Sequence, residues 1–138
     1  MLNPLASVAG NGVMDASPPM CLDQSFNYVY PVSLTALQQL NFQTVSIITS
    51  ADFLLRGLLF TTTGAFSLRL YDGNQYALSS DLIVSLNLLA VAGDPFPMFP
   101  EIFYPAGGRI TLDIEDTSDA PNTGQIIFIG ANRFHLNG

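Results

Sequence analysis

The chain has 138 residues, the usual length of a single domain with its own buried core. Charged residues make up only 11% of it, and its net charge is −7, with four arginines and no lysine. Because nucleic acids and anionic membranes are bound through clusters of Lys and Arg, this composition excludes direct nucleic-acid binding and binding to a membrane surface.

The low content of charged residues also limits how the surface of the protein can be built. Soluble domains usually carry about 25% charged residues, whereas this chain combines 11% charge with 49% hydrophobic residues. A neutral polar surface is one interpretation. The interpretation that we favour is a surface covered in large part by protein partners.

Cysteine and histidine occur once each, as Cys21 and His135. A single cysteine excludes an internal disulfide and a multi-cysteine metal site. We interpret Cys21 as a small buried hydrophobic residue, because a catalytic thiol needs a base beside it and the one histidine lies at the far end of the sequence. No pattern predicts a cofactor, a signal peptide or a transmembrane helix, so we expect synthesis in the cytoplasm.

Residues 1–24 are predicted to form an extended arm, and residues 25–138 a single β-sandwich domain. Proline and glycine recur in the arm at a density that disrupts both helix and strand. Such an arm offers a wide contact area to another chain. Its candidate interface residues are Leu2, Pro4, Leu5 and Val8.

Alternating and β-branched segments after the arm predict strands over residues 26–30, 40–48 and 54–63. Pro31 is expected to end the first of them. The clearest hairpin follows at residues 66–79, where Asp72-Gly73 supplies a turn that needs positive φ.

Residues 81–92 are ambiguous, because leucines at helical spacing accompany β-branched Ile83 and Val84. We favour a strand, since strands flank this segment. Residues 94–100 are predicted to be an extended loop, because three prolines remove backbone donors. Phe96, Met98 and Phe99 on this loop, and Tyr104 after it, either anchor a partner or pack into the end of the sandwich.

The cleanest alternation lies at residues 109–115, where Ile110, Leu112 and Ile114 are expected to face the core and Thr111 and Asp113 to face outward. A buried strand at residues 125–130 and a short one at 132–136 bring the total to about eight strands. This number and spacing predict a β-sandwich or a barrel.

Catalytic constellations are absent from the sequence pattern, and we expect no enzymatic activity. His135 is the only histidine that could serve as the base of a Ser-His-Asp set, and we interpret it as a structural residue. The acidic residues Asp113, Glu115, Asp116 and Asp119 are open to two interpretations, a calcium site or carboxylates that serve solubility.

Several segments together resemble jelly-roll cement proteins of tailed bacteriophages, which decorate and clamp a capsid. These segments are residues 53–57 (FLLRG), 66–79, 100–108 (PEIFYPAGG), 110–113 and 130–134 (GANRF). The resemblance implies a jelly-roll-like antiparallel β-sandwich of about eight strands. It also implies a homo-oligomer, expected to be a dimer, on a major capsid protein of the HK97 type at the virion surface.

Two other functions are weighed against capsid binding. A carbohydrate-binding jelly-roll module is the main alternative, and the absence of Trp, which commonly forms sugar platforms, counts against it. A small hydrolase is a weaker alternative, because no general base is evident.

Overall fold

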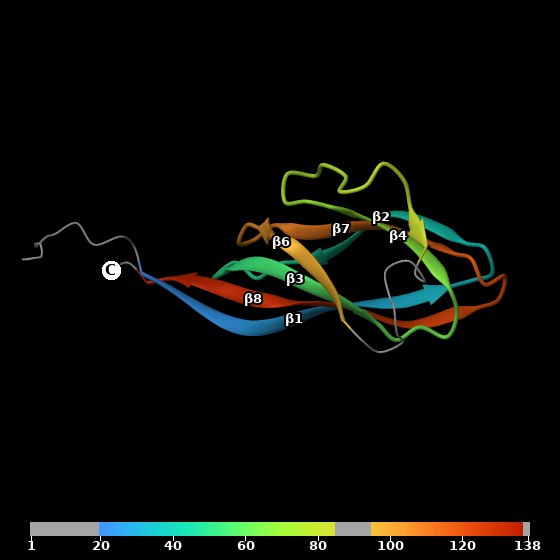
Figure 1. The fold of residues 1–138 in the computed structure, drawn as a ribbon, viewed down its shortest axis with the longest axis horizontal. Coiled ribbons are helices and arrows are strands. Elements are labelled where there is room, and N and C mark those ends of the chain that lie inside the picture. Colours follow the sequence, from blue (N-terminus) through green and yellow to red (C-terminus); the bar gives the residue numbers. More distant parts are fainter. Residues whose placement is uncertain (1–19, 85–94, 137–138) are drawn as a thin grey trace, which may run out of the picture.

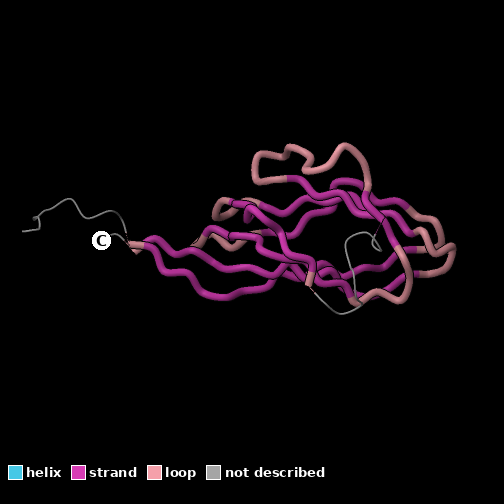
Figure 2. Tube along the Cα trace, viewed as in Figure 1, coloured by secondary structure: helices cyan, strands magenta, loops and turns pink. Residues whose placement is uncertain are grey.

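The computed structural model describes residues 20–84 and 95–136. This part of the chain contains strands and no helix (Figures 1 and 2). The strands are β1 (Cys21–Leu34), β2 (Gln39–Ser46), β3 (Asp52–Phe60), β4 (Phe66–Tyr71), β5 (Ile83–Val84), β6 (Phe96–Tyr104), β7 (Arg109–Asp116) and β8 (Asn122–His135).

The strands form two four-stranded antiparallel sheets. Sheet I has the order β1-β8-β3-β6, and sheet II has the order β2-β7-β4-β5. The pairs β1–β8, β2–β7, β3–β6 and β4–β5 run inward from the two ends of the chain, so the chain is one long hairpin ribbon. Rolling this ribbon brings β3 beside β8 and β4 beside β7, and these two pairs complete sheets I and II. This is the jelly-roll arrangement that was expected.

The core lies between the two sheets. Ile110, Leu112 and Ile114 of β7 point into it and are fully buried, as their alternation predicted. Phe53 and Leu55 of β3 meet them from sheet I and are equally buried. Burial of side chains of this size contributes about 1.5–3 kcal/mol each, so these inner faces carry most of the stability.

The outer face of sheet II differs from the expected exposed surface. Thr111 and Asp113 face outward but are only 2% and 1% exposed. The connection between β4 and β5, residues 72–82, arches over this side of the sandwich (Figures 1 and 2). Gln75 in this connection accepts a hydrogen bond from the Thr111 hydroxyl at 2.9 Å. Alternation predicted the direction of these side chains correctly, but not their burial.

Strand β1 is longer than predicted at both ends. It begins at Cys21, inside the predicted arm, because residues 21–25 pair with β8. It also continues through Pro31, because β1 is an edge strand and a missing backbone donor is tolerated there.

Two other expectations for the middle of the chain are corrected. The predicted return strand after Asp72-Gly73 is reduced to a bridge between Tyr71 and Ala77. The proline-rich loop is instead part of strand β6, which accommodates its prolines at a sheet edge. Of the ambiguous segment, the strand at Ile83–Val84 is confirmed, while residues 85–92 lie outside the described residues.

The β1–β8 ribbon extends past sheet II at one end (Figure 1). Both strands have 14 residues, whereas β2 and β7 have 8 each. The Tyr28 hydroxyl accepts the Ile48 N–H at 3.0 Å, which places the end of sheet II beside Tyr28. Residues 20–26 and 130–136 therefore project beyond it, and we call them the overhang.

Candidate protein-binding surface

Strand β6 forms an edge of sheet I and carries a wide bulge. It pairs with β3 at Leu55–Ile102 and again at Gly57–Pro97. Between these two pairs, residues Met98–Glu101 lie opposite Arg56 alone, and we call them the β6 bulge. Both ends of the bulge are fixed by regular pairing, so its central side chains are pushed out of the sheet.

The β6 bulge presents an aromatic ring to solvent. Phe99 is 96% exposed, and Phe103, which follows the bulge, is 52% exposed. Arg56 Nε donates to Glu101 Oε2 at 2.7 Å, which ties the base of the bulge to β3. An aromatic anchor on a fixed loop is typical of the residues that dominate binding energy at protein interfaces.

An open groove of about 640 Å³ lies beside the bulge. One wall consists of β6 and the other of the turn after β4. The residues that line it are Asp72, Gly73, Asn74, Leu78 and the run from Phe96 to Phe103. The groove is mostly apolar in its side chains, with Asp72 and Glu101 as its charged residues.

The turn wall of this groove is held rigidly. Asp72 Oδ1 accepts the N–H groups of Asn74 and Tyr76, both at 2.9 Å. A Cβ atom on Gly73 would come within 2.8 Å of the Phe103 carbonyl oxygen, so the turn rests directly on β6 and needs glycine there. The groove is therefore formed before any partner binds.

The interface candidates that the sequence placed on and after the proline-rich segment differ in their exposure. Phe99 is exposed, whereas Phe96 and Met98 are half-buried and pack against the core. Tyr104 is 0% exposed, and its hydroxyl donates to the Tyr71 carbonyl at 2.7 Å. This corrects the expectation for Tyr104: it belongs to the core and cannot contact a partner. Burial raises its pKa above the ordinary value.

The candidate residues of the arm are not placed by the structure. Leu2, Pro4, Leu5 and Val8 lie outside the described residues. The point at which the arm leaves the domain is defined, because Leu136 N–H donates to the Met20 carbonyl at 2.8 Å. The arm therefore begins at the tip of the overhang.

The overhang presents a second apolar surface that the sequence analysis did not identify. Its inward-facing side chains continue the alternation of core residue Tyr28, but sheet II does not reach them. Met20 is 67% exposed, Leu22 52%, Leu136 51% and Phe26 40%. Only the difference in strand length exposes them, so no local sequence signal marks this surface.

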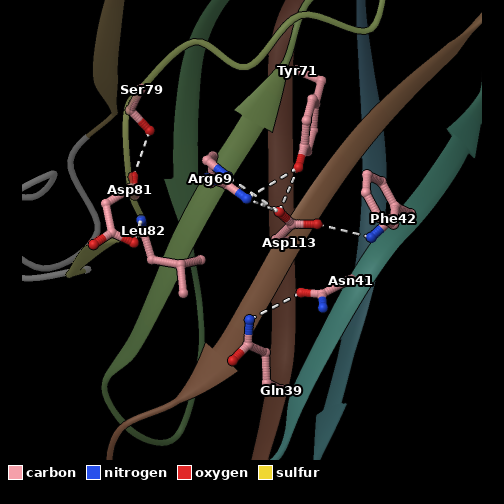
Figure 3. Close-up of polar contacts among 9 residues, drawn as sticks. All are labelled: Gln39, Asn41, Phe42, Arg69, Tyr71, Ser79, Asp81, Leu82 and Asp113. Atoms are coloured by element: carbon pink, nitrogen blue, oxygen red, sulfur yellow. Dashed lines mark hydrogen bonds and ion pairs between the residues drawn. The ribbon is translucent and has the colours of Figure 1, made fainter.

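The acidic residues contribute to the fold and do not form a common site. Asp113 is enclosed by β4 and by the bulge in β2 (Figure 3). Its carboxylate accepts hydrogen bonds from Tyr71 OH at 2.6 Å, Arg69 Nη2 at 2.9 Å and Phe42 N–H at 2.8 Å. Burial raises the pKa of Asp113, but these donors outweigh burial and hold it below the ordinary value.

Asp116 fixes a different part of the molecule. It accepts the Ser118 hydroxyl at 2.6 Å, Leu37 N–H at 2.8 Å and Asn122 Nδ2 at 3.1 Å, and these bonds hold its pKa below the ordinary value. Within residues 20–84 and 95–136, no group of three His, Cys, Asp or Glu side chains could hold a metal ion. Two of the four acidic residues thus connect strands and turns.

No family model matches the chain, and no curated protein matches it by sequence. Solved structures to which this chain is similar include a chain from Bacillus endospore appendages, described as disulfide-linked pili, with 15% identity and a TM-score of 0.40 over 88% of this chain and 93% of that one. Infectious bursal disease virus VP2, from a subviral particle, has 13% identity and a TM-score of 0.32 over 91% of this chain and 39% of that one.

A third similar structure is from infectious bursal disease virus strain Gx, with 12% identity and a TM-score of 0.32. The match covers 96% of this chain and 38% of the viral one. This chain thus spans well under half the length of the two viral chains. The described residues contain no helix that could span a membrane.

Proposed function

We propose that this chain is a virion structural protein, a cement protein that stabilises an icosahedral capsid shell without catalysing a reaction. Its partners in this proposal are the major capsid protein, of the HK97 type, and further copies of itself. The observation that carries the proposal is Phe99, 96% exposed on a bulge whose two ends are fixed. Covering a ring of this size contributes about 1.5–3 kcal/mol, which a free monomer would not gain.

The distribution of charge supports binding through apolar contacts. Arg56 pairs with Glu101, Arg69 with Asp113, and Arg133 with Asp23. Three of the four arginines are therefore committed to ion pairs inside the domain. Each apolar contact with a shell is weak by itself, but symmetry repeats it, and avidity then replaces single-site affinity.

The overhang supports the part of the proposal that concerns further copies. Its apolar face lies where the arm leaves the domain, and 19 residues precede Met20. At about 3.3 Å per residue, an extended arm of this length reaches about 60 Å, which is enough to cross to a neighbouring molecule. We assign the arm of a second copy, through Leu2, Leu5 and Val8, as the occupant of this face.

Replacement of Phe99 and Phe103 by serine tests the capsid contact. Purified protein is mixed with shells of the major capsid protein of the same virus, and the bound fraction is measured by co-sedimentation. We expect the double variant to lose at least tenfold in apparent affinity, because repeated sites multiply a loss of about 1–3 kcal/mol per contact. Leu37→Asn is the matched control, since Leu37 is 59% exposed away from the groove.

The fold of each variant is checked by circular dichroism and urea unfolding. Phe99 makes little contact with the domain, so its loss should not change stability. Undiminished binding by the folded double variant contradicts the proposed contact. Binding of wild-type protein to a glycan array, with no binding to shells, supports the carbohydrate-binding alternative instead.

A further inference from the structure

The β1–β8 pairing brings the one cysteine and the one histidine together. Cys21 and His135 are directly opposed in register, with Cys21 Sγ 3.5 Å from His135 Nδ1. On the other side of the imidazole ring, Nε2 lies 2.7 Å from Asp52 Oδ2 of β3. Asp52 Oδ1 in turn accepts the Ala106 N–H at 2.9 Å. Cys21 is exposed, which corrects the expectation that it is buried.

The hydrogen bonds determine what the histidine can do. An ionised carboxylate only accepts hydrogen bonds, so the proton of neutral His135 is on Nε2, facing Asp52. Nδ1 then presents its lone pair to the thiol. Burial raises the pKa of Asp52, but its bonds to His135 and Ala106 outweigh burial and keep it below the ordinary value. Nucleophile, base and orienting carboxylate thus stand in the order that activates a thiol.

Other charged groups on this face favour the same chemistry. Arg133 is two residues before His135 on β8, on the same face of the sheet, and its positive charge helps to hold the pKa of Asp52 below the ordinary value. Asp23 lies two residues from Cys21, but it is paired with Arg133 through Nε at 2.8 Å. The negative charge nearest to the thiol on its own strand is therefore compensated.

We propose that Cys21 is an activated thiol that exchanges with disulfides, with His135 as its general base and Asp52 as a positioning residue. The thiol proton passes to His135 Nδ1 as Sγ attacks one sulfur of the disulfide. A new S–S bond forms at Cys21, and the old S–S bond breaks. The departing thiolate takes the proton from His135, so Cys21 is oxidised as the departing sulfur is reduced, and the disulfide itself is the only oxidant.

This modification site goes beyond the proposed function, because the reaction is stoichiometric and does not depend on capsid binding. The electrophile is the sulfur of a disulfide, from either of two sources. It can belong to a small molecule such as oxidised glutathione. It can also belong to a second copy of this chain whose Cys21 already carries a mixed disulfide, in which case the product is a covalent dimer.

To test the proposal, the second-order rate constant for reaction of the full chain with a chromogenic aromatic disulfide is measured at about pH 7. We expect His135→Gln to reduce the rate about tenfold, near the lower end of general-base effects because the site is exposed. Asp52→Asn should reduce it by a smaller factor. Between about pH 8 and 7, the wild-type rate should fall less steeply than the rate of His135→Gln.

A relocated thiol provides the matched control. Ser25 is exposed on the same strand and the same face as Cys21, opposite Ala131 and away from His135. The double variant Cys21→Ser/Ser25→Cys should react at the rate of His135→Gln, and all thiols should react equally in concentrated urea. Equal rates for wild type, His135→Gln and the relocated thiol in the folded state would overturn the proposal.

The source of the disulfide is decided with oxidised glutathione in place of the chromogenic reagent. Mass spectrometry and a non-reducing gel then follow the product. A stable glutathione adduct on Cys21 assigns the small-molecule source, and its conversion to a covalent dimer assigns the second copy. Failure of wild type to form either product, under conditions where a free thiol does, also contradicts the proposal.

Discussion

Buried aspartates of this protein accept hydrogen bonds from backbone N–H groups and so hold neighbouring strands and turns together. Asp113 lies 2.8 Å from Phe42 N–H, a group that the bulge in β2 has withdrawn from regular pairing with β7. It also neutralises Arg69, whose guanidinium packs over Tyr71. Alternation placed Asp113 on the outer face, but only the connection above that face explains why an aspartate is buried there.

Asp113→Asn should lower the free energy of unfolding by about 2–4 kcal/mol, because one amide oxygen cannot replace a charged acceptor of several hydrogen bonds. Tyr71→Phe, which removes one donor, should cost about 1 kcal/mol. Urea unfolding measures both. Since the pKa of Asp113 is lowered in the folded state, its stabilisation is present above about pH 4 and is lost as the pH falls further.

The wild-type protein should therefore lose stability below about pH 4 more steeply than Asp113→Asn. The other aspartates with lowered pKa values, Asp23, Asp52 and Asp116, give both proteins a common residual slope. If the two unfolding curves had the same pH dependence, Asp113 would not be the buried acceptor described above.

At the scale of elements, β8 is the strand on which sheet I depends. It pairs with β1 along 14 residues and with β3 on its other side. A Cβ atom at Gly130 would collide with the Leu54 carbonyl oxygen of β3. Composition predicted a buried strand at residues 125–130 but could not show that its final glycine is needed by the neighbouring backbone.

Gly130→Ala should lower the free energy of unfolding by about 1–3 kcal/mol, the usual cost of overpacking. A backbone carbonyl cannot move aside as a flexible side chain can. Gly57→Ala is the comparison, because its Cβ would approach the Phe96 carbonyl oxygen at a milder 3.2 Å. Chemical denaturation ranks the two, and a smaller effect at Gly130 than at Gly57 contradicts this account.

At the scale of the whole molecule, the rolled ribbon places the two ends of the domain side by side. Met20 and Leu136 are hydrogen-bonded, and the overhang that they close has an uncovered apolar face. In the proposed assembly, the arm of a second copy covers this face. Within the part of the chain that the structure describes, the first core residue is Tyr28.

Deletion of residues 2–19 should leave the domain folded by circular dichroism, while sedimentation shows a shift from dimer to monomer and weaker binding to shells. Because association stabilises the folded state, the urea midpoint of the deletion variant should be lower than that of the full chain. Leu22→Ser in the full chain should have the same effect on association, because Leu22 is 52% exposed on the overhang. A dimer that persists in both variants would rule out the arm as the occupant. A monomeric wild-type protein would indicate that the arm folds back on its own copy.

The sequence by itself determined the all-β class, the positions of most strands and the low charge of the molecule, because these follow from local alternation, turn residues and composition. Only the tertiary structure decided that Phe99 is exposed while Tyr104 is buried, that Asp113 is covered, and that His135 meets Cys21. The physical reason is distance along the chain: Cys21 and His135 are 114 residues apart. Their contact depends on the register and rolling of the whole ribbon, which no local pattern encodes.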